Sequence, residues 1–207
     1  MTTILYIHGL GGGKDSRIPG YLNRKLSGSG INVVVRTYDF DPELASGQIS
    51  SWMDELCPDL IIGESMGANH AARLGGVPRL FVSPALGAPR AMVILRALLL
   101  IPGVRHLMLK LYPKREGERQ PITFDRNAMR GFSKLCDAGS IDTTGYVKAF
   151  FGTEDRYRRW GIVSLRRWTK LFGKSTYVEY KGTHYMEERF IDSLLIPEIR
   201  AILQGRC

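Results

Sequence analysis

The chain has 207 residues, of which 44% are hydrophobic and 24% charged, and its formal net charge is +9. This length and composition indicate one ordinary soluble globular domain over residues 1–207. The excess of Lys and Arg could attract an anionic partner, although a solvated basic surface is the simpler explanation.

Cysteine usage and hydrophobic runs argue against several protein classes. Cys57, Cys136 and Cys207 are odd in number and far apart, so they form neither a disulfide framework nor a Cys-x-x-Cys metal pair. No basic region or cleavage site of a signal peptide is visible before the first apolar run. The most apolar run, Ala91–Ile101, is interrupted by Arg96 and is too short to span a bilayer. We therefore expect a cytoplasmic protein without a transmembrane segment. Peripheral membrane contact and the oligomeric state stay open.

Predicted strands and helices alternate along the chain. The second strand is rich in β-branched residues, as a buried strand should be. Such alternation predicts a mostly parallel sheet with helices on both faces. The strands are predicted at Ile4–His8, Ile31–Tyr38, Leu60–Gly63, Arg79–Ser83, Tyr146–Gly152 and Ser175–Tyr180. The helices are predicted at Ser16–Ser27, Gln48–Leu56, Ala68–Leu74 and Trp160–Phe172, with a final helix that Pro197 kinks or restarts.

The third strand runs into a helix through a Gly-x-Ser-x-Gly pattern centred on Ser65 and flanked by Gly63 and Gly67. In a nucleophile elbow, the serine occupies a strained turn that lifts its hydroxyl above the sheet, and small neighbours let strand and helix approach. The same letters could mark an ordinary helix start with a serine cap. The position between an apolar strand and a helix favours the elbow.

A nucleophilic serine needs a base, and in proteins that carry this elbow the chain order is serine, acid, histidine. His8 precedes Ser65, His70 lies in the helix directly after it, and His106 falls in an apolar stretch before any acid-bearing loop. Only His184 follows a late strand, so it is the predicted base.

The third member of such a triad is an acid, which should lie in the loop after the strand Tyr146–Gly152. The loop after Gly152 supplies two candidates, Glu154 and Asp155. A solvated acidic turn paired with a neighbouring arginine would look the same. The serine and histidine at strand ends favour a Ser-acid-His triad.

A glycine-rich loop follows the first strand. Proteins that carry this elbow have one oxyanion donor in that loop and the other in the residue after the nucleophile. We assign the two donors to the backbone N–H groups of Leu10 and Met66. The second also lies at a helix N-terminus, whose dipole favours negative charge. A phosphate-binding loop does not fit, because the glycine and Lys14 spacing matches neither nucleotide pattern.

Several segments together resemble a known family. They are, in this order, ILYIHGLGG, IIGESMGANHAARL, FVSPALGAP, FFGTEDRY and GTHYMEERF. With these segments the chain resembles the α/β-hydrolase superfamily and, more narrowly, the small bacterial esterases of the YqiA type. The resemblance implies an α/β-hydrolase fold, with Ser65 as nucleophile, His184 as base and Asp155 as the acid that orients it.

A long apolar and basic insert, about residues 88–130, departs from the family pattern. It follows the strand Arg79–Ser83, where hydrolases of this fold commonly carry a lid. Its side chains could line an acyl pocket or could equally complete the core. The four pocket residues we predict are Met92, Leu95, Leu99 and Met108.

These features predict a serine hydrolase that cleaves a small-molecule carboxylic ester or thioester through an acyl-enzyme on Ser65, with no metal and no cofactor. The alternative is a catalytically silent hydrolase-like fold that binds a partner through its basic lid. The basic residues of the helix near Trp160–Phe172 mostly occupy its outward side, so we expect no nucleic-acid binding.

Overall fold

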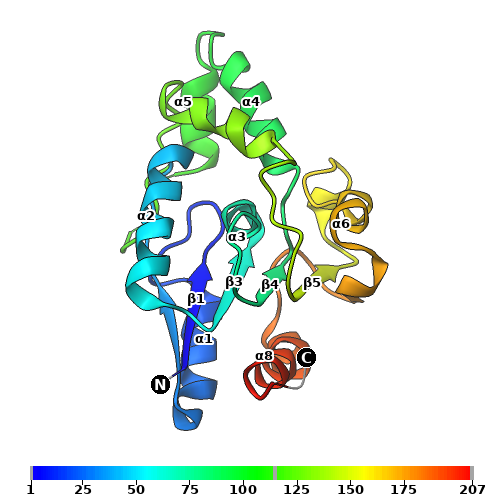
Figure 1. The fold of residues 1–207 in the computed structure, drawn as a ribbon. Coiled ribbons are helices and arrows are strands. Elements are labelled where there is room, and N and C mark those ends of the chain that lie inside the picture. The colour runs from blue at the N-terminus through cyan, green and yellow to red at the C-terminus, as the bar shows by residue number, and fades with distance from the viewer. Residues whose placement is uncertain (1, 114–115, 206–207) are drawn as a thin grey trace.

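Six parallel strands form the sheet at the centre of the molecule, in the order β2-β1-β3-β4-β5-β6 (Figure 1). This computed structural model describes residues 2–113 and 116–205, so Cys207 lies outside the described residues. The parallel sheet with helices on both faces agrees with the sequence prediction. The strands are β1 Thr2–Ile7, β2 Ile31–Val35, β3 Leu60–Glu64, β4 Arg79–Val82, β5 Val147–Gly152 and β6 Tyr177–Tyr180.

The central strands read as continuous apolar runs because both faces of the sheet are covered. Leu60, Ile61 and Ile62 of β3 are fully buried, as are Leu80 and Phe81 of β4. A strand covered on both sides has no solvent face and so loses the alternation of polar and apolar residues. This explains why strand positions were easy to predict here.

Helices cover the two faces of the sheet with separate apolar clusters. Helices α1 (Arg17–Leu26) and α8 (Ile196–Leu203) pack on one face, through buried side chains such as Leu22 and Ile199. Helices α2 (Pro42–Leu56), α3 (Ala68–Ala71) and α6 (Leu165–Phe172) contribute to the cluster on the other face.

Some element boundaries differ from the prediction, and capping explains two of them. Helix α2 begins at Pro42 rather than Gln48, because the Asp41 side chain accepts from the Glu43 N–H and proline is favoured at a first helical position. Helix α6 begins at Leu165, where Ser164 caps it.

The remaining differences are shorter or divided elements. The strand predicted over Ile31–Tyr38 ends at Val35, and the Tyr38 side chain instead donates to the His8 carbonyl oxygen. Helix α3 is a single turn after a 3₁₀ turn over Ser65–Gly67. The final helix is divided into α7 (Glu188–Phe190), a π-helical segment (Ile191–Leu195) and α8, with Pro197 in the first turn of α8.

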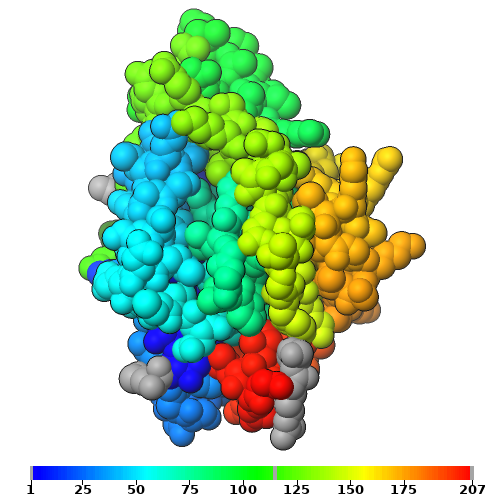
Figure 2. Space-filling view, viewed as in Figure 1, coloured from blue at the N-terminus to red at the C-terminus, as the bar shows by residue number. Residues whose placement is uncertain are grey.

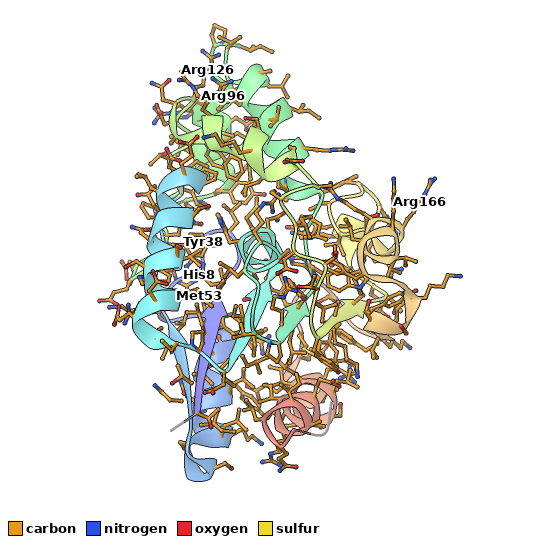
Figure 3. All side chains as sticks on the ribbon, viewed as in Figure 1. His8, Tyr38, Met53, Arg96, Arg126 and Arg166 are labelled. Atoms are coloured by element: carbon orange, nitrogen blue, oxygen red, sulfur yellow. The ribbon has the colours of Figure 1, made fainter. Side chains whose placement is uncertain are left out.

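The insert follows β4 and forms the upper part of the molecule in Figure 1. It contains α4 (Ala88–Leu98), α5 (Val104–Leu111) and a 3₁₀ helix over Ala128–Cys136. Arg96 and Arg126 lie side by side (Figure 3) and each donates to the backbone carbonyl of the other, at 2.8 and 3.3 Å. These two bonds attach α4 to the returning chain. From here on, "the insert" means residues 88–136.

Candidate active site

Ser65 occupies a strained backbone position at the carboxyl end of β3. Its φ is +49°, in the left-handed region that residues with a side chain rarely adopt. A Cβ on Gly63 would lie 2.6 Å from the Ala71 Cβ, and one on Gly67 would lie 2.3 Å from the carbonyl oxygens of Ile7 and His8. The two glycines therefore let β3, α3 and β1 approach closely around the raised serine.

Three side chains from distant parts of the chain form one hydrogen-bonded series at this point. The Ser65 Oγ lies 2.8 Å from the His184 Nε2, and the His184 Nδ1 lies 2.7 Å from the Asp155 Oδ2. Since a carboxylate only accepts, the Nδ1–H donates to Asp155, which leaves Nε2 free to accept from the serine hydroxyl. This is the arrangement that activates a serine.

The structure distinguishes the two neighbouring carboxylates that sequence reasoning left open. Asp155 is 3% exposed, and its second oxygen accepts from the Tyr157 N–H at 2.8 Å. Glu154 is exposed to solvent. After β5 ends at Gly152, the chain turns at Thr153 and Glu154, and the Asp155 N–H reaches back to the Gly152 carbonyl oxygen. Only Asp155 faces the imidazole.

Two residues that sequence reasoning missed hold His184 in place. The Ser83 hydroxyl at the end of β4 donates to the His184 carbonyl oxygen at 2.8 Å. The Tyr157 ring meets the imidazole edge-on, with centroids 4.7 Å apart. Neither residue carries a local sequence signal, because each reaches His184 from a different strand end.

A buried polar stack lies behind the glycine-rich loop. The His8 and Tyr38 rings are stacked with centroids 4.2 Å apart, and Figure 3 labels both. The His8 Nδ1 donates to the Gly9 carbonyl at 2.7 Å, and burial lowers the pKa of His8 to about 4. A Cβ on Gly12 would lie 2.8 Å from that Nδ1, so the loop rests directly on the neutral imidazole.

Glu64, next to Ser65 in the chain, is half-buried. Its carboxyl accepts from the Tyr6 hydroxyl at 2.8 Å, and burial raises its pKa. Sequence reasoning gave it no role. Its side chain borders the cleft described next.

A cleft of about 700 Å³ opens at Ser65 and His184. Leu10 and Met66 both line it beside the serine, and the oxyanion role assigned to their backbone N–H groups stays a prediction. One wall is largely apolar and the rim carries arginines. The apolar wall includes Ala88, Ala91, Met92, Leu111, Tyr112, Ile122 and Ile162, and the rim includes Arg17, Arg119 and Arg156.

The four predicted pocket residues divide between cleft and core. Met92 lines the cleft, whereas Leu95, Leu99 and Met108 pack against the buried cluster instead. The cleft takes only the first turns of α4, and the helix then runs past its rim. The sequence showed that these side chains are apolar but left open whether each one lines a pocket or completes the core.

Within residues 2–113 and 116–205, no group of three or more His, Cys, Asp or Glu side chains is placed to hold a metal ion.

Comparisons with known proteins identify the fold. No protein-family model matches the sequence, and no curated protein matches it either. Among solved structures, mouse alpha/beta hydrolase domain-containing protein 10 is similar over 99% of this chain and 90% of its own, with a TM-score of 0.64 and 16% identity. A tomato methylketone synthase I variant complexed with beta-ketoheptanoate has a TM-score of 0.63 and 9% identity, covering 99% and 98%.

A third solved structure has the same fold. An extracellular alpha/beta-hydrolase from a Paenibacillus species, described as sharing structural and functional homology with tobacco salicylic acid binding protein 2, has a TM-score of 0.56 and 12% identity. It covers 97% of this chain and 98% of its own. The chain thus has the α/β-hydrolase fold that its motifs predicted. The narrower likeness to YqiA-type esterases stays a prediction.

Proposed function

From the α/β-hydrolase fold and the side chains at its elbow, we propose that this protein is a serine hydrolase that cleaves a carboxylic ester or thioester. The observation that carries the proposal is the continuous series from Ser65 Oγ through His184 to Asp155, with contacts of 2.8 and 2.7 Å. The strained φ of Ser65 supports it, because such strain persists where the surrounding structure enforces it, commonly at functional sites.

The reaction follows from the roles of these atoms. His184 Nε2 takes the proton of Ser65 as Oγ attacks the substrate carbonyl, which forms a tetrahedral oxyanion. Collapse breaks the bond to the alcohol or thiol, which leaves with the proton from Nε2, and the acyl group stays on Ser65. Water then attacks the acyl-enzyme with His184 again as base, releasing the acid and restoring the serine. Asp155 holds the imidazole tautomer and stabilises the imidazolium throughout.

The backbone amides of Leu10 and Met66 would stabilise the oxyanion. Both residues line the cleft next to Ser65. A 3₁₀ turn begins at Ser65, and α3 follows it directly. The N-terminal amides of this helical segment therefore lie next to Ser65, where they favour negative charge. Rigid support of the glycine loop by the stacked His8 and Tyr38 rings suits this role, because preorganised donors are most effective.

The alternative function is a silent hydrolase-like fold that binds a partner through its insert. A silenced enzyme has no need of a buried carboxylate, a tautomer-fixed histidine and a strained serine in hydrogen-bond contact. Retention of all three therefore favours the enzyme over the binding module.

Labelling with a fluorophosphonate probe tests the proposal. We expect one probe per chain on the wild type and none on Ser65→Ala, detected by intact mass spectrometry. Ser50→Ala, which removes an exposed serine of α2, is the matched control and should label fully. A wild type that resists the probe would favour the binding module, and labelling of Ser65→Ala would place the nucleophile elsewhere. A panel of acyl esters and thioesters of graded chain length then identifies the preferred substrate.

A further inference from the structure

The exposed apolar side chains of this protein are concentrated in the insert. Of the eleven large hydrophobic residues that are exposed within the described ranges, eight lie between Val93 and Tyr112. Ile94 and Leu100 are 63% and 65% exposed. Figure 2 shows this part of the chain, in green, projecting at the top of the molecule. Contiguous exposed apolar surface on a soluble domain marks an interaction site.

The core of the protein does not need these side chains. The inner side of the two helices already packs against the buried cluster through Met92, Leu95, Leu99, Met108 and Leu109. The residues that remain outside define what we term the outer face: Val93, Ile94, Leu98, Leu100, Ile101 and Leu107. This face has no partner among the residues that the structure describes.

The charges around the outer face have one sign. Between Ala88 and Pro113 the sequence holds four basic residues and no acidic one. Arg90, Arg105 and Lys110 are exposed, and none of them forms an ion pair with a carboxylate in the described ranges. An apolar surface bordered by unpaired basic side chains complements an anionic lipid bilayer, which offers phosphates at its surface and acyl chains just beneath.

Two short helices carry the outer face. Helix α4 has 11 residues and α5 has 8, and no helix in the described part of the chain is long and apolar enough to cross a membrane. A helix with an apolar face and a basic polar face lies in the plane of the membrane interface. A second copy of the chain fits less well, because a two-fold contact would bring the same positive charges together.

We propose that the outer face of α4 and α5 docks this protein onto an anionic lipid bilayer. The apolar side chains of that face enter the interfacial region, and Arg90, Arg105 and Lys110 contact headgroup phosphates. Docking rests on the insert alone and does not depend on the proposed hydrolase activity.

The cleft opens beside the docking surface. Leu111 and Tyr112, which are 62% and 40% exposed, belong to the same exposed stretch and also line the cleft. Met92 lines the cleft next to Val93 of the outer face. A docked chain would thus hold the mouth of its cleft near the lipid. If the proposed function holds, this position gives an apolar acyl ester a direct path to Ser65.

Vesicle flotation of the full chain tests the docking. We expect the protein to float with phosphatidylcholine vesicles that contain about one third phosphatidylglycerol, and to bind pure phosphatidylcholine at least about tenfold more weakly. Ile94→Ser/Leu98→Ser should lower partitioning to the anionic vesicles at least about tenfold, since it removes apolar anchors. Arg90→Gln/Lys110→Gln should lower it about fivefold per charge.

Matched controls separate docking from general effects. Leu44→Ser removes an exposed leucine of α2. Arg166→Gln/Lys170→Gln removes two exposed charges of α6. Arg166 lies at the right of the view in Figure 3, away from the insert at the top. Both should bind vesicles like the wild type, as should Ser65→Ala, so the result is independent of catalysis. Circular dichroism should show every variant of the insert, of Leu44 and of α6 folded, because the changed side chains are exposed.

Three outcomes would overturn the proposal. The wild type could stay with the lipid-free fraction, the insert variants could float as well as the wild type, or the controls could lose binding equally. Sedimentation without lipid covers the competing occupant: a dimer that Ile94→Ser/Leu98→Ser dissociates would assign the outer face to self-association.

Discussion

The serine elbow and the insert are built on opposite principles. Around Ser65 the backbones of three elements are in contact, and the neighbouring Ala68, Ala71 and Ala72 are fully buried. In the insert, leucine and isoleucine side chains stand in solvent. At the elbow, small residues let the backbones pack closely and so fix the position of the Ser65 Oγ. In the insert, large apolar side chains remain exposed to solvent. The tightly packed elbow and the exposed apolar surface thus lie in separate parts of one fold.

That contrast predicts where single substitutions should be costly. A change at the elbow acts on packed backbone or on a hydrogen-bonded atom, and neither can relax without moving the sheet. A change on the outer face of the insert acts on side chains that are exposed and do not pack in the core. The following predictions test the contrast, from the largest expected effect to the smallest.

Removing the charge of the buried carboxylate should have the largest effect. Asp155→Asn should lower kcat by about 10⁴-fold, because in a known triad this change favours the wrong histidine tautomer. Its exposed neighbour is the matched control, and Glu154→Gln should stay within about tenfold of the wild type. Ester hydrolysis at saturating substrate measures both. If Glu154→Gln proves the crippling change, the assignment of the acid is wrong although the hydrolase proposal survives.

A methyl group at the elbow should be nearly intolerable. On Gly67 a Cβ would lie 2.3 Å from two backbone carbonyl oxygens, so Gly67→Ala should cost at least about 4 kcal/mol in the free energy of unfolding. Gly47→Ala on α2 is the control, because its Cβ would have no neighbour within 4 Å. That control should gain about 0.5–1 kcal/mol. Urea denaturation compares them, and equal stabilities would contradict the tight packing described here.

Acid should weaken the packed region through its two buried histidines. Burial lowers the pKa of both His8 and His70 to about 4 in the folded state, from a value near 6.5 when unfolded. Between these values the unfolded chain binds protons that the folded chain does not, so stability is full above about pH 6.5 and falls as the pH drops toward about 4. We expect a loss of about 2 kcal/mol per histidine between about pH 7 and pH 5.

The variant His70→Gln isolates one of these contributions. Denaturation at both pH values should show that its loss on acidification is smaller than that of the wild type by about 2 kcal/mol. Burial raises the pKa of Glu64, which acts in the opposite direction and is common to both proteins. An unchanged pH dependence in His70→Gln would refute the titration of this residue.

The smallest effect should come from the insert, where neighbouring residues face different ways. Met92 lines the cleft and Val93 is exposed on the outer face. Met92→Ser should lower kcat/KM for a long-chain acyl ester about tenfold and leave an acetyl ester nearly unchanged, because the acyl tail draws binding energy from apolar contacts. Val93→Ser should change neither. Equal losses on both esters, with lower thermal stability, would instead mean that Met92 acts as core packing.

The sequence predicted more about the candidate site than about the insert. The two glycines at fixed spacing predict Ser65 as the nucleophile, and chain order among the four histidines predicts His184 as the base. Asp155 could be separated from Glu154 only by resemblance, because the turn after Gly152 decides which of the two carboxylates faces the imidazole and the sequence does not show the path of that turn. The roles of Ser83 and Tyr157 carried no signal at all.

The sequence by itself determined what depends on neighbours along the chain. Apolar strands, a glycine-flanked serine and the alternation of helix and strand all record local constraints of backbone geometry. Only the tertiary structure decided what depends on residues far apart: the 2.7 Å contact across β5 and β6 that selects Asp155, the end of the cleft after the first turns of α4, and the exposure of Ile94 and Leu98. The physical reason is that helical periodicity marks which side chains are apolar, whereas burial is set by the element that happens to pack against them.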